Sequence, residues 1–286
     1  MRARAECFGA ATIVNALAIG KGAAYGIRMR AEAEADLSDG PGPLRIDVHP
    51  EDAGDGLVRA CIGRMSGMLK KSLAGWVATR STIPPSRGLK SSSATANATV
   101  LAAARSLGVS LGDFEAVNLG VDAALDAGVT ITGAFDDACA TYFGGVVVTD
   151  NRRRVVLMRN RLPTNLVAVV AVPIEKIEKR SLRDVDFSPI AGEVTEAFDH
   201  AMAGDYGPAI ETNSRAYCRL LGIDPMPATK ARRAGAIAAG LTGTGPAFVA
   251  LCRPAGADAV ADAMSSDTMR ARLVSLNTTI TPEAFP

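Results

Sequence analysis

The clearest pattern in the chain is an alternation of apolar and charged side chains over residues 27–36. Successive side chains of a β-strand point to opposite faces, so this alternation predicts a half-solvated antiparallel strand. The preceding apolar stretch ends in a glycine-rich turn, and together they predict a strand–turn–strand unit. The apolar positions are Ile27, Met29, Ala31, Ala33 and Ala35, and the charged positions are Arg28, Arg30, Glu32, Glu34 and Asp36.

Short strands and longer helices follow, each with its own spacing. Strands are predicted at Leu44–Val48 and Gly75–Thr79, which lie beside loops rich in Gly and Pro. Helices are predicted where apolar residues recur every three or four positions, or where small residues run up to a glycine. These helices cover Val58–Leu73, Ala94–Leu107 before Gly108, and Leu111–Ala127.

A β-hairpin and a second α/β region complete the pattern. Two β-branched runs in residues 146–159 surround Asp150-Asn151, which predicts a hairpin. The polar, proline-containing step Asn160–Thr164 is the expected boundary between domains 1–160 and 165–286. The whole pattern indicates an α+β fold with mixed or antiparallel sheets. Beyond the boundary we expect strands at Leu166–Val172, Pro246–Cys252 and Arg272–Leu276, and helices at Ile190–Ala203, Pro208–Leu221, Ala231–Gly240 and Ala257–Met264.

Composition and charge narrow the class of partner. The chain has 286 residues, 48% of them apolar, and a net charge of +1, which is ordinary for a globular protein and argues against nucleic acid. No uninterrupted run of about 18 apolar residues occurs, so we expect no membrane span. The five cysteines lack a CxxC pair and there are only two histidines, which argues against disulfides, a zinc site or a histidine triad. The expected location is the cytoplasm, and the expected ligand is a small molecule.

The stretch Pro84–Ala98, PPSRGLKSSSATANA, is the first candidate binding site. Its prolines and Gly88 oppose regular structure, and three serines follow where a small-residue helix begins. The first amides of a helix have no internal acceptor and carry the positive end of the macrodipole, an arrangement that suits phosphate. A serine N-cap in an ordinary turn is the alternative. The Walker motif is absent, and GKG at Gly20–Gly22 does not replace it because glycine follows Lys21.

Two further segments carry candidate chemistry. Ile131–Gly145 places Asp136 and Asp137 side by side among small and apolar residues. Neighbouring carboxylates are costly to bury, so they indicate a bound cation or a proton-transfer role, and a solvated acidic turn is the alternative. The segment Leu241–Phe248, LTGTGPAF, is a glycine-rich turn ahead of a strand, which is a weak signal by itself.

Together and in this order, the three segments resemble the motifs of the GHMP superfamily of small-molecule kinases. The loop Gly88–Ala94 is similar to the family's Pro-x-x-x-Gly-Leu-Gly-Ser-Ser-Ala-Ala nucleotide loop, although Lys90 and Ser93 depart from the usual glycine and alanine. Leu241–Phe248 resembles the third family motif, and Thr12–Leu17 resembles a degenerate first motif. The resemblance covers essentially the whole chain. It implies a two-lobed α+β fold, with an N-terminal mixed α/β nucleotide-binding lobe and a C-terminal ferredoxin-like α/β lobe.

The resemblance also implies roles for individual residues. The family's general base is an Asp seven residues before a Gly-Gly pair, which corresponds to Asp137, with Asp136 supporting it or binding the substrate ring. The family holds Mg²⁺ with a loop serine and an upstream acid, which correspond to Ser92 and Asp126, with Asp122 as the fallback. ATP and Mg²⁺ are therefore the implied cofactors. The implied nucleotide-binding residues are Pro85, Ser86, Arg87, Gly88, Leu89, Lys90, Ser91, Ser92, Ser93, Ala94, Gly243, Thr244 and Gly245.

The combination of GLKSSS, TGAFDDA and GTGP most resembles the archaeal-type shikimate kinases within this superfamily. That likeness implies ATP-dependent phosphorylation of the shikimate 3-hydroxyl in aromatic amino-acid synthesis, with Arg87, Lys21 and Arg28 as candidate ligands of the substrate carboxylate. Homoserine kinases share the third motif but usually carry Asn at the position of Asp137. Mevalonate-pathway kinases usually keep the glycine that Lys90 replaces. A non-catalytic GHMP-like binding protein is the alternative from another class, and a homo-oligomeric assembly stays open.

Overall fold

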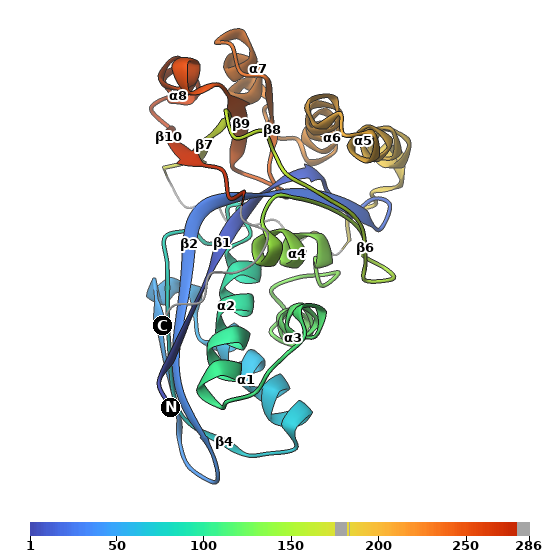
Figure 1. Ribbon diagram of the computed structural model, residues 1–286. Coiled ribbons are helices and arrows are strands. Elements are labelled where there is room, and N and C mark those ends of the chain that lie inside the picture. Colours follow the sequence, from blue (N-terminus) through green and yellow to red (C-terminus); the bar gives the residue numbers. More distant parts are fainter. Residues whose placement is uncertain (175–181, 183, 279–286) are drawn as a thin grey trace.

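The computed structural model describes residues 1–174, 182 and 184–278. The strands of its N-terminal part are β1 (Ala3–Val14), β2 (Lys21–Asp39), β3 (Leu44–His49), β4 (Leu73–Ser81), β5 (Val146–Asp150) and β6 (Val155–Asn160). They form one sheet with the order β3-β4-β2-β5-β6, and β1 pairs with β2 outside that path (Figure 1). The β3–β4 pair is parallel and the other pairs are antiparallel, so the sheet is mixed, as the sequence predicts.

The long β1–β2 hairpin confirms the strand–turn–strand prediction. From Ile27 onwards the apolar positions of β2 are buried, while the charged positions that alternate with them are more exposed. The register places Ala3 opposite Ala35 and Cys7 opposite Ala31, so small side chains face each other across the pair. Small side chains on the buried face let the helices pack close to the sheet.

Helices cover one face of this sheet (Figure 1). In residues 1–160, all of them described, these helices are α1 (Gly56–Leu69), α2 (Ser91–Ser106), α3 (Asp113–Asp126) and α4 (Phe135–Phe143), with a 3₁₀ turn at Glu51–Ala53. The predicted helix Val58–Leu73 is too long, because Lys70 takes a left-handed φ of 53° that ends α1, and Leu73 begins β4. The sequence pattern predicts no helix over residues 135–143, where α4 forms.

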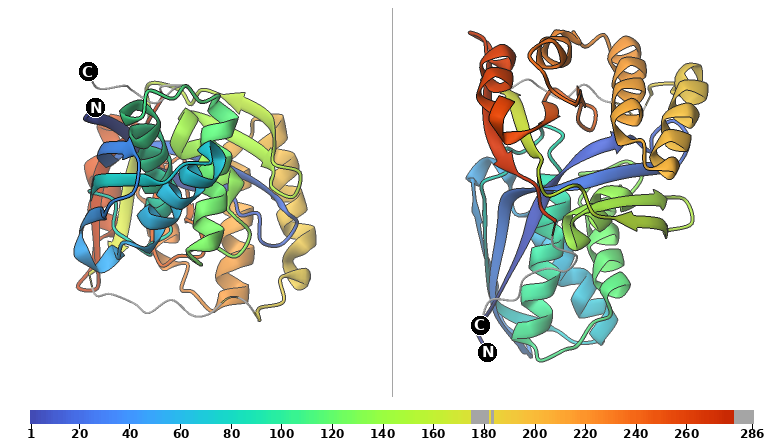
Figure 2. Two further views of the ribbon diagram at one scale, coloured as in Figure 1. Left: turned by 90° about the horizontal axis from the view of Figure 1, so that it is seen from below. Right: turned by 45° about the horizontal axis from the view of Figure 1, so that its top comes forward.

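The C-terminal part is a four-stranded antiparallel sheet with the order β10-β7-β9-β8, in which β7 is Val167–Pro173, β8 is Ala238–Leu241, β9 is Phe248–Cys252 and β10 is Met269–Ser275. Figures 1 and 2 show its helices in the half of the molecule opposite α1–α4, with β1 and β2 running between the two halves. These helices are α5 (Ala191–Ala203), α6 (Tyr206–Leu221), α7 (Met226–Arg233) and α8 (Ala257–Met264), with 3₁₀ turns at Ser188–Ile190 and Pro254–Gly256.

The predicted helix Ala231–Gly240 is wrong. α7 already ends at Arg233, and Gly235 takes a φ of 99° that breaks the helix before β8 begins. β8 then lies so close to α6 that a Cβ added at Gly240 would come within 2.7 Å of Ile210 Cγ2. The small residues that suggest a helix are therefore needed for close packing of a strand. The other C-terminal helices and strands form where the sequence predicts them, to within a few residues.

Hydrogen bonds join the two halves at more than one place. In α6, the Tyr217 hydroxyl donates to the Asn15 carbonyl at 3.1 Å and accepts from the Ala18 amide at 3.1 Å. After β10, the Asn277 backbone amide donates to the Gly26 carbonyl at 3.0 Å. The Asn277 backbone carbonyl accepts from the Gly145 amide at 2.8 Å. The division into domains 1–160 and 165–286 stays a prediction. Among the described residues, no helix has both the length and the apolar character needed to cross a membrane.

Candidate active site

The loop before α2 has an unusual backbone that sets where the helix begins. Ser86, Gly88 and Lys90 all take left-handed φ angles, of 57°, 78° and 64°. A Cβ at Gly88 would lie 2.0 Å from the Thr242 carbonyl oxygen, so only glycine fits there. α2 starts at Ser91 rather than at the predicted Ala94, and all three serines therefore lie in its first turn.

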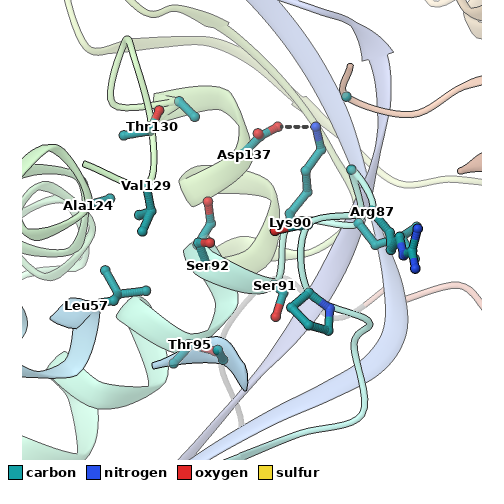
Figure 3. Close-up of a pocket in the computed structure, with 18 of the residues that line it drawn as sticks. Leu57, Arg87, Lys90, Ser91, Ser92, Thr95, Ala124, Val129, Thr130 and Asp137 are labelled. Atoms are coloured by element: carbon teal, nitrogen blue, oxygen red, sulfur yellow. Dashed lines mark ion pairs between the residues drawn. The ribbon is translucent and has the colours of Figure 1, made fainter. Parts of the chain in front are cut away.

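The start of α2 has the geometry of a phosphate site. The Ala94 amide is the first to bond back along the helix, donating to the Lys90 carbonyl at 3.0 Å. The amides before it belong to the serine triplet, and such leading amides have no acceptor within a helix. The positive end of the helix dipole and the Ser91 and Ser92 hydroxyls add to their attraction for an anion (Figure 3).

Two segments far apart in the sequence hold this loop in place. The Thr242 hydroxyl donates to the Gly88 carbonyl at 2.8 Å and accepts from the Thr12 amide at 3.1 Å. The Thr12 hydroxyl in turn accepts from the Gly243 amide at 2.8 Å. The Asn15 side chain donates to the Gly243 carbonyl at 3.0 Å. The first and third motif segments therefore meet behind the serine loop and fix its position.

The acidic pair lies in the first turn of α4, close to this loop. Gly133 and Ala134 take left-handed φ angles of 82° and 48°, which turn the chain sharply into the helix. The Asp137 carboxylate then forms an ion pair with Lys90, with Oδ1 2.9 Å from Nζ (Figure 3). The side chains are only 18% and 6% exposed, respectively, so solvent screens the pair weakly. Asp137 is thereby fixed beside the start of α2.

Asp136 is more deeply buried and lies in a different environment. The Asn151 side chain donates to Asp136 Oδ1 at 2.7 Å, and Asn151 Oδ1 accepts from the Asp136 amide at 3.2 Å and from the Thr149 hydroxyl at 2.7 Å. Burial raises the pKa of the Asp136 carboxyl to about 7; the neighbouring Asp137 carboxylate adds to the rise, while Lys90 and Asn151 oppose it. Near neutral pH this group is therefore divided between acid and carboxylate forms.

These groups open onto one cavity of about 550 Å³, within the range of about 300–1,000 Å³ found for small-molecule sites. Both acids line it. Two of the predicted nucleotide-binding residues, Ala94 and Gly245, do not line the cavity. Ala94 is fully buried, and Gly245 closes its turn by donating to the Thr242 carbonyl at 3.0 Å. Those that line the cavity are Pro85, Ser86, Arg87, Gly88, Leu89, Lys90, Ser91, Ser92, Ser93, Gly243 and Thr244.

The predicted metal ligands are not brought together. Ser92 lines the cavity, but both oxygens of Asp126 accept from Arg64, each at 2.5 Å, and Asp126 lies outside the cavity wall. The fallback, Asp122, accepts from Arg154 at 2.6 Å. Within the described part of the chain, no cluster of three or more His, Cys, Asp or Glu side chains could hold a metal ion. The residues present therefore offer a hydroxyl for Mg²⁺ but no carboxylate cage.

Of the three candidate ligands of a substrate carboxylate, one lines the cavity and two do not. Arg87 is buried and lines the cavity. Lys21 lies over the Phe198 ring, with Nζ 5.3 Å from its centroid, and Arg28 lies over Phe8 at 5.1 Å. Neither Lys21 nor Arg28 belongs to the cavity wall as described. Arg87 is thus the candidate that the geometry favours.

Several site residues carry no local signal in the sequence. Thr12 and Thr242 act through contacts with residues more than two hundred positions away. Asn151 stands in a predicted turn, where asparagine is common for conformational reasons alone. Lys90 is predicted as a nucleotide residue, but its partnership with Asp137 depends on the folded chain.

Comparison with known proteins agrees with this architecture. The sequence profile of the GHMP kinases N terminal domain matches residues 57–145, and that of the GHMP kinases C terminal region matches residues 229–271. The chain belongs to the GHMP kinase family. Within the family it is 45% identical to the shikimate kinase of Methanothrix thermoacetophila, over 93% of this chain and 91% of that protein. It is 41% identical to the shikimate kinase of Pyrococcus abyssi, over 88% and 92% of the two chains. The predicted likeness to archaeal-type shikimate kinases is confirmed.

Solved structures share the fold at low sequence identity. The homoserine kinase of Cytophaga hutchinsonii superposes with a TM-score of 0.76 at 19% identity, covering 99% of this chain and 97% of that chain. The Lactococcus lactis galactokinase complexed with galactose gives a TM-score of 0.75 at 11% identity, covering 99% and 95%. These likenesses confirm the two-lobed α+β GHMP kinase fold.

Proposed function

We propose that this chain is a shikimate kinase, which transfers the γ-phosphoryl group of ATP to the 3-hydroxyl of shikimate. The single observation that carries the proposal is the Lys90–Asp137 ion pair, which sets a carboxylate next to the phosphate site at the start of α2. The naming of its relatives from Methanothrix and Pyrococcus as shikimate kinases supports the choice of substrate.

The mechanism follows from these positions. Phosphoryl transfer depends on positioning and charge neutralisation more than on covalent chemistry. The leading amides of α2 and the Ser91 hydroxyl bind the phosphates of ATP, and the Lys90 ammonium neutralises part of their charge. Asp137 then orients the attacking hydroxyl and accepts its proton as that oxygen bonds to the γ-phosphorus; the bond from the γ-phosphorus to the bridging β-phosphate oxygen breaks, and ADP leaves. Lys90, which contacts Asp137 at 2.9 Å, links the base to the phosphate site.

Asp136 has a separate part in this proposal. Asn151 holds one of its oxygens, and the carboxyl lines the cavity next to Asp137. A carboxyl with a pKa raised to about 7 by burial is partly protonated at neutral pH, and it can donate as well as accept a hydrogen bond. We assign it to a ring hydroxyl of the substrate other than the one that reacts.

In the proposed mechanism, Mg²⁺ binds together with the nucleotide. When bound, the ion would neutralise charge on the phosphate oxygens, and the Ser92 hydroxyl would be its ligand from the protein. Asp126 would have to leave Arg64 to take part, so the mechanism does not depend on it. The five cysteines are free and buried, which supports the expected cytoplasmic location.

The decisive experiment is an assay of ADP release with purified protein, Mg·ATP and one alcohol at a time. We expect turnover with shikimate, and none of comparable efficiency with homoserine or mevalonate. Phosphate on the 3-hydroxyl is checked by NMR of the product. Turnover on homoserine alone would refute the proposed substrate, and the absence of turnover on every alcohol would favour the non-catalytic alternative.

A further inference from the structure

Hydrogen bonds within the protein fix the direction in which the Asn151 side chain faces. The Asp136 backbone amide can only donate, so the Asn151 atom that meets it at 3.2 Å is the oxygen Oδ1. The Thr149 hydroxyl donates to the same oxygen at 2.7 Å. The Asn151 Nδ2 group is thereby turned toward the Asp136 carboxyl, and it donates to Asp136 Oδ1 at 2.7 Å. One oxygen of the carboxyl is therefore held by a donor that is itself fixed.

The GKG segment that begins β2 bounds the other side of this carboxyl. A Cβ added at Gly22 would lie 2.3 Å from Asp136 Oδ2, so a larger residue there would push the carboxyl out of its place. Gly22 pairs with Thr149 of β5, and the Gly20 carbonyl accepts from the Asn151 backbone amide at 2.9 Å. The start of β2 and the turn after β5 thus form one holder around Asp136.

This holder is buried, and its polar groups lower the stability that the same space could provide. Asp136, Asn151 and Thr149 are all buried. Burial raises the pKa of the Asp136 carboxyl to about 7, and the neighbouring Asp137 carboxylate adds to the rise, which the bond from Asn151 only partly offsets. Well-packed apolar side chains of similar volume would often be as stable or more so. A buried carboxyl with a dedicated holder in a cavity wall is explained best by a ligand that it binds.

We infer that Asn151 is a positioning residue, which aims the Asp136 carboxyl into the cavity so that it binds a hydroxyl of the acceptor alcohol other than the reacting one. Thr149 fixes Asn151, and Gly22 makes room for the second oxygen of Asp136. The inference rests on the proposed function in taking an alcohol with more than one hydroxyl as the acceptor. It goes beyond that function in assigning the affinity for the acceptor partly to Asn151, which lies outside the cavity wall as described.

The test is steady-state kinetics with shikimate at saturating Mg·ATP, with ADP affinity measured separately by calorimetry. Asn151→Leu removes the amide and keeps a side chain of similar size. A hydroxyl that does not react is bound alike in the ground state and the transition state, so its loss raises KM more than it lowers kcat. We expect KM for shikimate to rise about ten- to a hundredfold, the effect of losing a hydrogen bond to a charged group. We expect kcat to stay within about threefold and ADP affinity within about twofold of the wild type.

A double variant tests whether Asn151 acts through Asp136. In an Asp136→Ala background no carboxyl remains to be positioned. Adding Asn151→Leu should then raise KM for shikimate by no more than about twofold further, because the two residues act as one unit. A second rise as large as the one in the wild-type background would overturn the inference.

The support from Thr149 gives a milder variant with its own rescue. Thr149→Val removes the hydroxyl that bonds to Asn151 Oδ1 and keeps the shape of the side chain. We expect KM for shikimate to rise about three- to tenfold, the effect of losing one neutral hydrogen bond. Thr149→Ser keeps the hydroxyl and should stay within about twofold of the wild type. If Asn151→Leu does not fold, this pair decides the question, and equal KM values in the two variants overturn the inference.

Asp150 provides a matched control in the same turn. Its side chain accepts from the Arg153 backbone amide at 3.0 Å, and it lies outside the cavity wall as described. Asp150→Ala loosens the turn but leaves the side chain of Asn151 in place, so KM for shikimate should stay within about twofold of the wild type. A rise as large as that of Asn151→Leu would mean that any loosening of the turn has this effect, and it would overturn the inference.

The wild type decides the proposed function separately. If the wild type phosphorylates shikimate and the Asn151 and Thr149 variants keep its KM, the inference alone fails. If the wild type phosphorylates a different alcohol, the proposed function fails, and the same variants are measured with that alcohol. If it phosphorylates no alcohol, the inference fails together with the proposed function.

Discussion

Replacing Gly88 by alanine tests the loop that positions the proposed phosphate site. Gly88 takes a φ of 78°, a left-handed conformation that costs an alanine roughly 1–2 kcal/mol. The added Cβ would also lie 2.0 Å from the Thr242 carbonyl oxygen, 1 Å closer than the 3.0 Å limit below which real Cβ atoms are essentially never found. The backbone on one side must therefore move.

The magnitude follows from two local losses besides the backbone strain. Forcing an extra carbon into a closely packed contact costs about 1–3 kcal/mol. Moving the loop also breaks the 2.8 Å hydrogen bond from the Thr242 hydroxyl to the Gly88 carbonyl, a loss of about 0.5–1.5 kcal/mol. We expect Gly88→Ala to reduce the free energy of unfolding by about 2.5–6.5 kcal/mol in total.

Gly108 provides a matched control, since it has a left-handed φ of 67° and nothing within 4 Å of an added Cβ. Gly108→Ala should show only the backbone cost, about 1–2 kcal/mol. Thermal unfolding should therefore place Gly88→Ala about 3–18 °C below Gly108→Ala, because the extra loss of about 1.5–4.5 kcal/mol corresponds to about 2–4 °C per kcal/mol. Equal unfolding temperatures for the two variants would refute the packing described for this loop.

Three further substitutions test the acids. Asp137→Asn should lower shikimate turnover at least about a hundredfold while ADP binding is kept; undiminished turnover would remove Asp137 from the mechanism. Asp126→Asn tests the predicted role of Asp126 as a Mg²⁺ ligand. Because Asp126 is paired with Arg64, we expect no change in the Mg²⁺ concentration that gives half the maximal rate. A several-fold rise in that concentration would instead support the predicted role. The pKa of Asp136 is about 7 in the folded chain, above the ordinary value of 3.8. Between these two pH values the folded chain keeps a proton on Asp136 that the unfolded chain has lost. The free energy of unfolding therefore falls as the pH rises through this range. Asp136→Asn should lose this part of the pH dependence of the unfolding temperature, and an unchanged dependence would contradict the burial described here.

The sequence was most informative where a pattern repeats or where local chemistry is strict. Alternation along β2 predicted its buried and exposed faces, because a strand imposes the period on every residue. The glycine at position 88 and the serines after it predicted a loop that turns into a helix, and most of the implied nucleotide residues do line the cavity. The role of each of these residues still stays a prediction, because geometry alone places them without testing them.

The sequence was least informative where distant contacts decide the structure. α4 is short and has two acids in its first turn, and its start depends on left-handed residues at Gly133 and Ala134 rather than on periodicity. The small residues of β8 are also common in helices, so the sequence alone favours a helix there. They form a strand because α6 packs directly against Gly240.

The hydrogen bonds of Asn277 bear on the order in which the protein can assemble during its synthesis. Asn277 bonds to Gly26 in β2 and to Gly145, which lies two residues beyond the helix carrying both acids. A ribosome releases Gly145 long before Asn277, so the nascent N-terminal half cannot complete this corner by itself. Part of the framework of the candidate site is therefore finished by a residue translated long after the acids, and a chain stalled before Asn277 would hold the acids on an unfinished support.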